Sequence, residues 1–123
     1  MSEPIKSYRD LTVWKSGIDL TVACYEATRT FPRDELYGLT SQIRRAAASI
    51  PANVAEGHGR DSTGQFIQFL RIAQGSVKEL ETHLIVGERV GILDPGIASQ
   101  LLARCDEVGR MLRSLIRTLE SKQ

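Results

Sequence analysis

The residues with the clearest capacity for acid–base or metal chemistry are two histidines, each near a glutamate. His58 follows Glu56 by two residues in a glycine-flanked segment, and His83 lies four residues after Glu79. A zinc site needs three or four protein ligands, and neither histidine has that many at a workable spacing. The paired Glu-x-x-His motifs of a di-iron bundle are also absent from the sequence. We therefore interpret both histidines as structural and predict a non-enzymatic protein without a metal or cofactor.

Two cysteines, Cys24 and Cys105, are far apart in the sequence and lack the spacing of a metal motif. The N-terminal residues contain no hydrophobic signal region, and no apolar run approaches the ~20 residues that cross a bilayer. We therefore expect a cytoplasmic protein with no membrane contact. Thiols stay reduced in that compartment, so both cysteines are predicted to be buried and unpaired.

Clustered arginines have the chemistry to bind phosphate, and they fall in two groups, Arg44 with Arg45 and Arg110 with Arg113 and Arg117. The formal net charge is only +1, so nucleic-acid binding would depend on such local clusters. Asp106, one turn before Arg110, and Glu120 on the same face favour the alternative of a solvated helix with i,i+4 ion pairs. The pattern also predicts no exposed aromatic residues among the arginines of the kind that stack on single-stranded bases.

Four amphipathic helices are predicted to position these residues. The 123 residues suffice for one domain with its own core, and no segment alternates with the period of two that marks a strand. The helices are expected at residues 10–30, 39–58, 62–90 and 95–121, with residues 1–9 flexible. Because the connections are short, we predict an all-α fold, an antiparallel up-down-up-down four-helix bundle.

Local signals define the helix starts. Asp10 is a suitable N-cap for the first helix, and Asp94 followed by Pro95 is a strong start signal for the fourth. Ser62 with Gln65 three residues later has the form of a capping box.

Apolar spacing predicts which side of each helix faces the core. For the first helix the expected residues are Leu11, Trp14, Ile18, Val22 and Tyr25. The third helix has the most regular seam, comprising Phe66, Leu70, Ala73, Val77, Leu80 and Leu84. The fourth is expected to bury Ile97, Leu101, Val108, Leu112, Leu115 and Leu119. Tyr37, in the first connection, is the one large side chain there that could pack against the bundle.

The second helix is the least ordinary element of the sequence. Its predicted core stripe comprises Leu39, Ile43, Ala46, Ala47, Ile50 and Val54. Pro51 interrupts it, removes an N–H and frees the carbonyl of Ala47, at a cost of ~3 kcal/mol in a helix interior. We expect a bent helix, with Ser49 and Asn53 supplying local hydrogen bonds; the alternative is a helix that ends at Ile50 and restarts at Pro51. Gly57 and Gly59 are expected to end it in the left-handed conformation.

The segments DLTVWKSGIDL, TRTFPRDELYGLTSQIRRAAASIPANVAEGHGR and FIQFLRIAQGSVKELETHL resemble the family of proteins encoded in intervening sequences of bacterial 23S rRNA genes. The similarity extends from about residue 10 to 119, and its most specific part is the run from the paired arginines through S-I-P-x-N-x-A-E-G. Members are also labelled S23 ribosomal protein-like, although the family has no ribosomal role. The resemblance implies a four-helix bundle that assembles into a ring-shaped homopentamer. It also implies similarity to accessory variability proteins of retroelements, in which a basic ring binds nucleic acid and a reverse transcriptase.

Two functions follow from these observations. The first is an oligomeric protein that binds RNA or DNA through the arginine groups. The alternative is a protein–protein interaction scaffold without a nucleic-acid role, in which the outer side of the second helix is assembly surface. The residues of that surface are Arg45, Ala48, Ser49, Pro51, Ala52, Asn53, Ala55 and Glu56.

Overall fold

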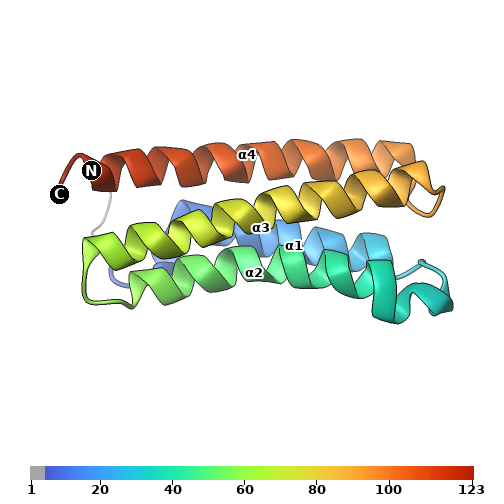
Figure 1. Ribbon diagram of the computed structural model, residues 1–123, viewed down its shortest axis with the longest axis horizontal. Coiled ribbons are helices and arrows are strands. Elements are labelled where there is room, and N and C mark those ends of the chain that lie inside the picture. Colours follow the sequence, from blue (N-terminus) through green and yellow to red (C-terminus); the bar gives the residue numbers. More distant parts are fainter. Residues whose placement is uncertain (1–4) are drawn as a thin grey trace.

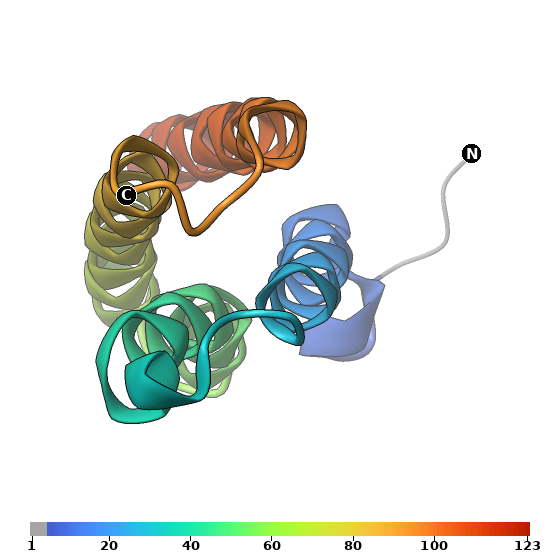
Figure 2. The same cartoon turned by 90° about the vertical axis from the view of Figure 1, so that its right-hand side faces the viewer.

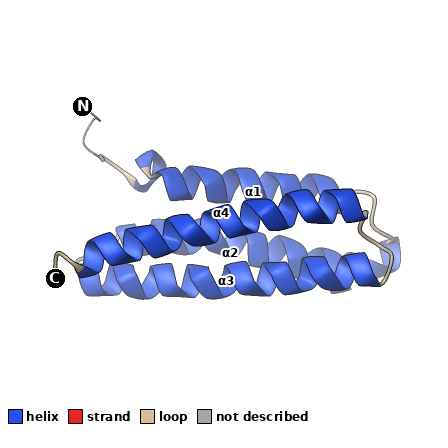
Figure 3. Cartoon of the chain, turned by 90° about the horizontal axis from the view of Figure 1, so that it is seen from above, coloured by secondary structure: helices blue, strands red, loops and turns tan. Residues whose placement is uncertain are grey.

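The computed structural model describes residues 5–123, which form four long helices lying side by side (Figure 1). The helices are α1 (Thr12–Thr28), α2 (Ser41–His58), α3 (Thr63–Arg89) and α4 (Pro95–Glu120). The colours of Figure 1 show that successive helices run in opposite directions. The described part of the chain contains no strand (Figure 3). The predicted all-α class and four-helix bundle are confirmed.

Each helix has two neighbours in the bundle. α2 packs against α1 and α3, and α4 packs against α3 and, less extensively, against α1. Viewed end-on, α2 and α4 therefore occupy opposite corners (Figure 2). None of the described helices combines the length and apolar character needed to cross a membrane.

Helix starts follow the local signals at two of the three predicted caps. Ser62 accepts a hydrogen bond from the Gln65 N–H at 3.1 Å, and Asp94 accepts one from Ile97 with Pro95 at the first helical position. The Asp10 cap was wrong, because Asp10 instead accepts hydrogen bonds from Lys6 and Ser7 in a short 3-10 turn, η1 (Tyr8–Asp10). The predicted flexibility of residues 1–4 lies outside the described residues.

The left-handed helix end also lies elsewhere than predicted. Gly59 has a φ of −80°, and the only positive φ among the described residues belongs to Gly91, at +79°. Gly91 follows α3, where the N–H of Ile92 donates to the carbonyl of Gly87 at 2.9 Å, as in a Schellman motif. Gly57 is required for a different reason, since a Cβ there would lie 2.6 Å from the Cβ of Phe69.

Pro51 lies inside an unbroken helix, so α2 does not end at Ile50 and restart. The freed carbonyl of Ala47 accepts a hydrogen bond from the Thr21 hydroxyl of α1 at 3.1 Å. α1 approaches closely here because Gly17 has no side chain, and a Cβ at that position would lie 3.3 Å from the Pro51 ring. The expected local hydrogen bond is present too, since Asn53 Nδ2 donates to the Ser49 carbonyl at 2.8 Å. The bend of the axis remains a prediction.

This close contact explains why the predicted inner face of α1 was only partly right: Leu11 is buried and Trp14 packs against the core, but the later positions differ. Its buried residues are Val13, Gly17, Leu20, Cys24 and Thr28. Val22 and Tyr25, expected in the core, are 51% and 43% exposed. Both sides of α1 carry apolar residues, and contact with Pro51 requires the side that presents Gly17.

Faces of the later helices match the sequence better. In α3, every member of the predicted seam except the half-buried Phe66 is fully buried. In α4, Leu101, Val108 and Leu112 are buried as predicted, whereas Ile97 is 40% exposed because Ala98 faces the core in its place.

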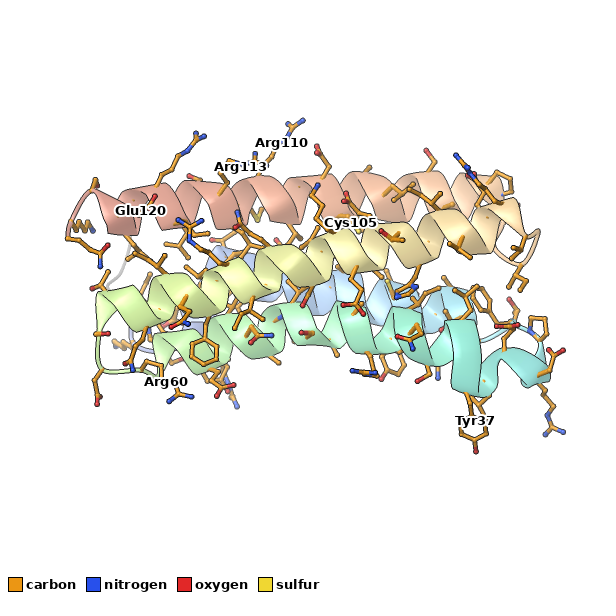
Figure 4. All side chains as sticks on the ribbon, in the orientation of Figure 1. Tyr37, Arg60, Cys105, Arg110, Arg113 and Glu120 are labelled. Carbon is orange, nitrogen blue, oxygen red and sulfur yellow. The ribbon has the colours of Figure 1, made fainter. Side chains whose placement is uncertain are left out.

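Two short elements connect α1 to α2: the 3-10 turn η2 (Arg33–Glu35) and the π-helical turn η3 (Leu36–Thr40). Gly38 within η3 has non-helical angles, φ −108° and ψ −111°. This turn directs Leu39 toward Gly87 of α3, with a Leu39 methyl 3.2 Å from a Cβ built there. Tyr37 consequently points away from the bundle and is 92% exposed, so its predicted packing was wrong (Figure 4).

Candidate nucleic-acid interface

Arg44 is the arginine whose side chain the fold holds most firmly. Its Nε donates a hydrogen bond to the hydroxyl of Thr28 at 2.9 Å, and its guanidinium carbon lies 4.6 Å from the centroid of the Tyr25 ring. The buried Thr28 hydroxyl donates in turn to the carbonyl of Cys24. Within residues 5–123, the terminal nitrogens of Arg44 have no hydrogen-bond or ion-pair partner. They are therefore oriented and available to an anion.

A groove of about 420 Å³ lies beside this guanidinium, where the end of α1 meets η3 and the start of α2. Its lining consists of two tyrosines, two arginines, two hydroxyl residues and two aliphatic residues: Tyr25, Leu36, Tyr37, Thr40, Ser41, Arg44, Arg45 and Ala48. Arg45 is exposed, as is most of the Tyr37 ring. The absence of exposed aromatic residues among the arginines, predicted from the sequence, was therefore wrong.

Carboxylates do not neutralise this groove within the described part of the chain. Neither Arg44 nor Arg45 forms an ion pair there. Glu35, which immediately precedes η3, has its Oε1 3.0 Å from the Leu39 N–H and accepts a hydrogen bond from it. The site is thus cationic, with aromatic and hydroxyl groups beside the charge.

The α4 arginines have a different environment. Arg110 pairs with Asp106 at 2.9 Å, as the i,i+4 spacing predicts, and both side chains are mostly exposed. Glu120 pairs instead with Arg71 of α3 at 2.9 Å. Arg113 and Arg117 are both exposed and form no ion pair among the described residues. Arg110 and Arg113 both extend outward from α4 in Figure 4.

The two arginine groups do not converge within one chain. Arg44 and Arg45 belong to α2 and the other three arginines to α4, and these two helices occupy opposite corners of the bundle (Figure 2). A single short segment of nucleic acid therefore cannot contact both groups of the same copy.

The outer side of α2 is divided between internal contacts and open surface. Pro51 is buried, and the Ser49 hydroxyl lies 2.8 Å from that of Ser76 on α3, with Asn53 3.0 Å from Ser49 Oγ. Ala48 and Ala55 are half-buried. The exposed positions are Arg45, Ala52 and Glu56, and Glu56 pairs with Arg60 at 2.8 Å.

The histidines and cysteines have structural surroundings. His58 packs edge-on against Phe66, and the Nε2 of His83 lies 3.7 Å from a Glu79 oxygen. Within residues 5–123, no group of three or more histidine, cysteine or acidic side chains is placed to hold a metal ion. Both cysteines are buried and unpaired, as predicted, and burial raises the pKa of each thiol to about 12. A thiol that stays protonated is a poor nucleophile.

Sequence reasoning missed Tyr25, Thr28 and Tyr37 as companions of the arginines. The apolar spacing of α1 places Tyr25 in the core, whereas the structure leaves it 43% exposed. The contact between Thr28 and Arg44 joins residues 16 positions apart, and no local pattern indicates it. Tyr37 was identifiable as a bulky residue in a polar connection, but its direction depends on the turn at Gly38.

Comparison with known proteins places this geometry in a family. No curated protein matches the sequence. A crystal structure of a protein of unknown function from the S23 ribosomal protein family of Bacteroides thetaiotaomicron is similar, with 23% sequence identity and a TM-score of 0.77. The similarity covers 85% of this chain and 98% of that one, and at this identity it supports the fold alone. The family model described as 23S rRNA-intervening sequence protein matches residues 9–114. The four-helix chain thus belongs to the 23S rRNA-intervening sequence protein family, as its resemblance predicted.

Proposed function

We propose that this protein is a non-enzymatic, self-associating bundle of the cytoplasm that binds RNA or DNA through its arginine-bearing helix surfaces. The observation that carries the proposal is the fixed Arg44 guanidinium, with open terminal nitrogens next to the exposed Arg45. Phosphate binding depends on cations that are clustered and not already paired with carboxylates. Arg113 and Arg117 supply a second such pair on α4.

Assembly would raise the affinity of these small arginine clusters for nucleic acid. A single copy has a formal charge of only +1, and its two arginine surfaces project from opposite corners. In an assembly, each surface recurs once per subunit, so one nucleic-acid strand can contact equivalent arginines on several copies. The homopentamer implied by the family resemblance would repeat each surface five times. Linked contacts of this kind raise overall affinity without any new type of interaction.

The test is a fluorescence-anisotropy titration with labelled RNA and duplex DNA at two salt concentrations, on protein whose mass is known from light scattering. We expect the affinity to fall with salt, because phosphate contacts release counterions. Arg45→Glu and the double variant Arg113→Glu with Arg117→Glu should each weaken binding and lower the salt dependence by about one unit of slope per lost contact.

Arg89→Glu is the matched control. Arg89 is an exposed arginine near the end of α3, outside both groups, and it forms no ion pair in the described chain. Its reversal makes the same change in net charge as Arg45→Glu and should leave affinity close to wild type. If all three charge-reversed proteins bind alike, the named arginines are not the contacts.

The second candidate function is a protein-interaction scaffold. It is favoured by the exposed alanine on the outer side of α2 and by the exposed Val22 on α1. An intact oligomer that binds neither RNA nor duplex DNA at low salt would exclude the nucleic-acid function and leave this one.

A further inference from the structure

We propose that the groove at the start of α2 binds an unpaired nucleotide of single-stranded nucleic acid, with its base stacked on Tyr37 and its phosphate on Arg44 and Arg45. This inference rests on the proposed function, and it specifies which form of nucleic acid this surface prefers. It concerns only the groove at Tyr37 and assigns no base contact to α4.

Tyr37 has the exposure that a stacking residue needs. Its side chain is 92% exposed and points away from the helices in Figure 4. An exposed tyrosine ring has a large apolar face, and packing within the bundle does not explain its position. Bases of any type can stack on such a face, and single-stranded binding proteins use aromatic rings beside cations in this way.

The turn that carries Tyr37 is held by its own hydrogen bonds. The Glu35 carboxylate caps η3 by accepting from the Leu39 N–H at 3.0 Å, and a Cβ at Gly38 would lie 2.9 Å from that carboxylate. Leu39 then anchors the turn against α3. The ring is therefore presented from a braced backbone, which lowers the conformational cost of ordering it on binding.

The cationic part of the groove is also ordered before binding. The contacts of Arg44 with Thr28 and Tyr25 fix the plane of its guanidinium. Arg45 and the hydroxyl of Ser41 line the same groove. A fixed guanidinium can donate two parallel hydrogen bonds to a phosphate, and hydroxyl groups can bind sugar or base edges.

Two comparisons favour an unpaired strand. The groove has a volume of about 420 Å³, within the roughly 300–1,000 Å³ of sites that bind one small molecule. A base of an unpaired strand can enter such a site, whereas a duplex hides its base faces inside the stack. The clefts lined by Arg110 and Arg113 on α4 contain no aromatic residue. Those arginines can contact phosphates of single strands and duplexes alike, so only the α2 groove is expected to distinguish them.

The experiment compares wild type, Tyr37→Ala and Tyr37→Phe on three fluorescent ligands: a single-stranded RNA of about 12 nucleotides, an abasic strand of equal length, and a duplex. Because Tyr37 is almost fully exposed, both variants should fold, and circular dichroism verifies this. We expect Tyr37→Ala to lose at least about five-fold in affinity for the base-containing single strand. Its affinity for the abasic strand and the duplex should be unchanged. Tyr37→Phe keeps the ring and should bind like wild type.

The outcomes separate this inference from the function on which it rests. If Tyr37→Ala binds the base-containing strand as wild type does while Arg45→Glu weakens it, the protein binds nucleic acid without a stacking site. Equal losses for the abasic and base-containing strands would also overturn stacking. If wild type binds none of the three ligands, the proposed function and the stacking site are both wrong.

Discussion

At the scale of single residues, Thr21 makes a proline acceptable inside α2. Pro51 leaves the carbonyl of the fully buried Ala47 without its helical partner, and an unsatisfied buried carbonyl costs about 1–3 kcal/mol. The Thr21 hydroxyl contacts this carbonyl at 3.1 Å and that of Gly17, in its own helix, at 2.8 Å. One side chain thus provides the hydrogen bond that the helix itself lacks.

We therefore expect Thr21→Val to lower the free energy of unfolding by about 1–3 kcal/mol, measured by urea denaturation. Thr82→Val is the matched control, because the exposed Thr82 hydroxyl donates to the Lys78 carbonyl one turn earlier in its own helix. It should change stability by no more than a few tenths of a kcal/mol. Equal effects of the two substitutions would mean that the contact with Ala47 does not stabilise the protein.

The sequence made part of this arrangement predictable. Pro51 identified the freed carbonyl, and the proximity of Asn53 to Ser49 predicted the local hydrogen bond that the structure contains. Thr21 could not be identified in the same way, because it is 26 residues from Ala47. Its role depends on which face of α1 turns inward, and apolar residues on both sides of that helix left the face ambiguous.

At the scale of elements, α2 and α3 are joined by a turn that depends on a buried glycine. Gly57 lies against Phe69 and Phe66, and its missing side chain allows the two helices to approach. Gly75, in the middle of α3, is exposed and would meet nothing within 4 Å. Substitution by alanine should therefore have opposite effects on stability at these two positions.

We expect Gly57→Ala to destabilise the protein by about 1–3 kcal/mol, because the added methyl group overlaps the Phe69 Cβ, which cannot move without its backbone. Gly75→Ala should stabilise it by up to ~1 kcal/mol through improved helix propensity. Thermal or urea unfolding of both variants measures the difference. A stabilised Gly57→Ala would contradict the close packing at this turn.

Element ends and element faces differed in how well the sequence predicted them. The caps at Ser62 and Asp94 depend on residues within one turn, so local pattern was sufficient. The α3 seam was predictable because its members recur at regular steps of three and four residues, although Ile72, Ile85 and Val86 of the same helix are exposed. The inward face of α1 and the exposure of Ile97 depend on contacts with other helices, which a local pattern does not reveal. These positions were predicted wrongly.

At the scale of the whole molecule, the exposed part of α2 is the proposed surface for self-association. Ala52 is exposed between residues that make internal contacts, so a larger side chain there should not disturb the bundle. We expect Ala52→Glu to reduce the mass of the assembly, measured by light scattering, with helix content unchanged by circular dichroism. The physical reason is the cost of burying a charge in an interface between subunits.

Ala103→Glu, at an exposed position of α4, is the control with the same substitution. It should leave the mass unchanged. An Ala52→Glu protein with the mass of wild type would show that this part of α2 is not an assembly surface.

The hydroxyl pair of Ser49 and Ser76 has a consequence for the register of the bundle. The apolar seam of α3 repeats every seven residues, so hydrophobic packing alone is nearly satisfied when α3 slides along α2 by one repeat, about 10 Å. Such a slide would separate Ser76 of α3 from the Ser49 hydroxyl of α2, which lies 2.8 Å from it, whereas Asn53 would keep its hydrogen bond to Ser49 within α2. The buried Ser76 hydroxyl would then lose its hydrogen-bond partner on α2. The Ser49–Ser76 hydroxyl pair therefore favours one axial alignment of α3 on α2.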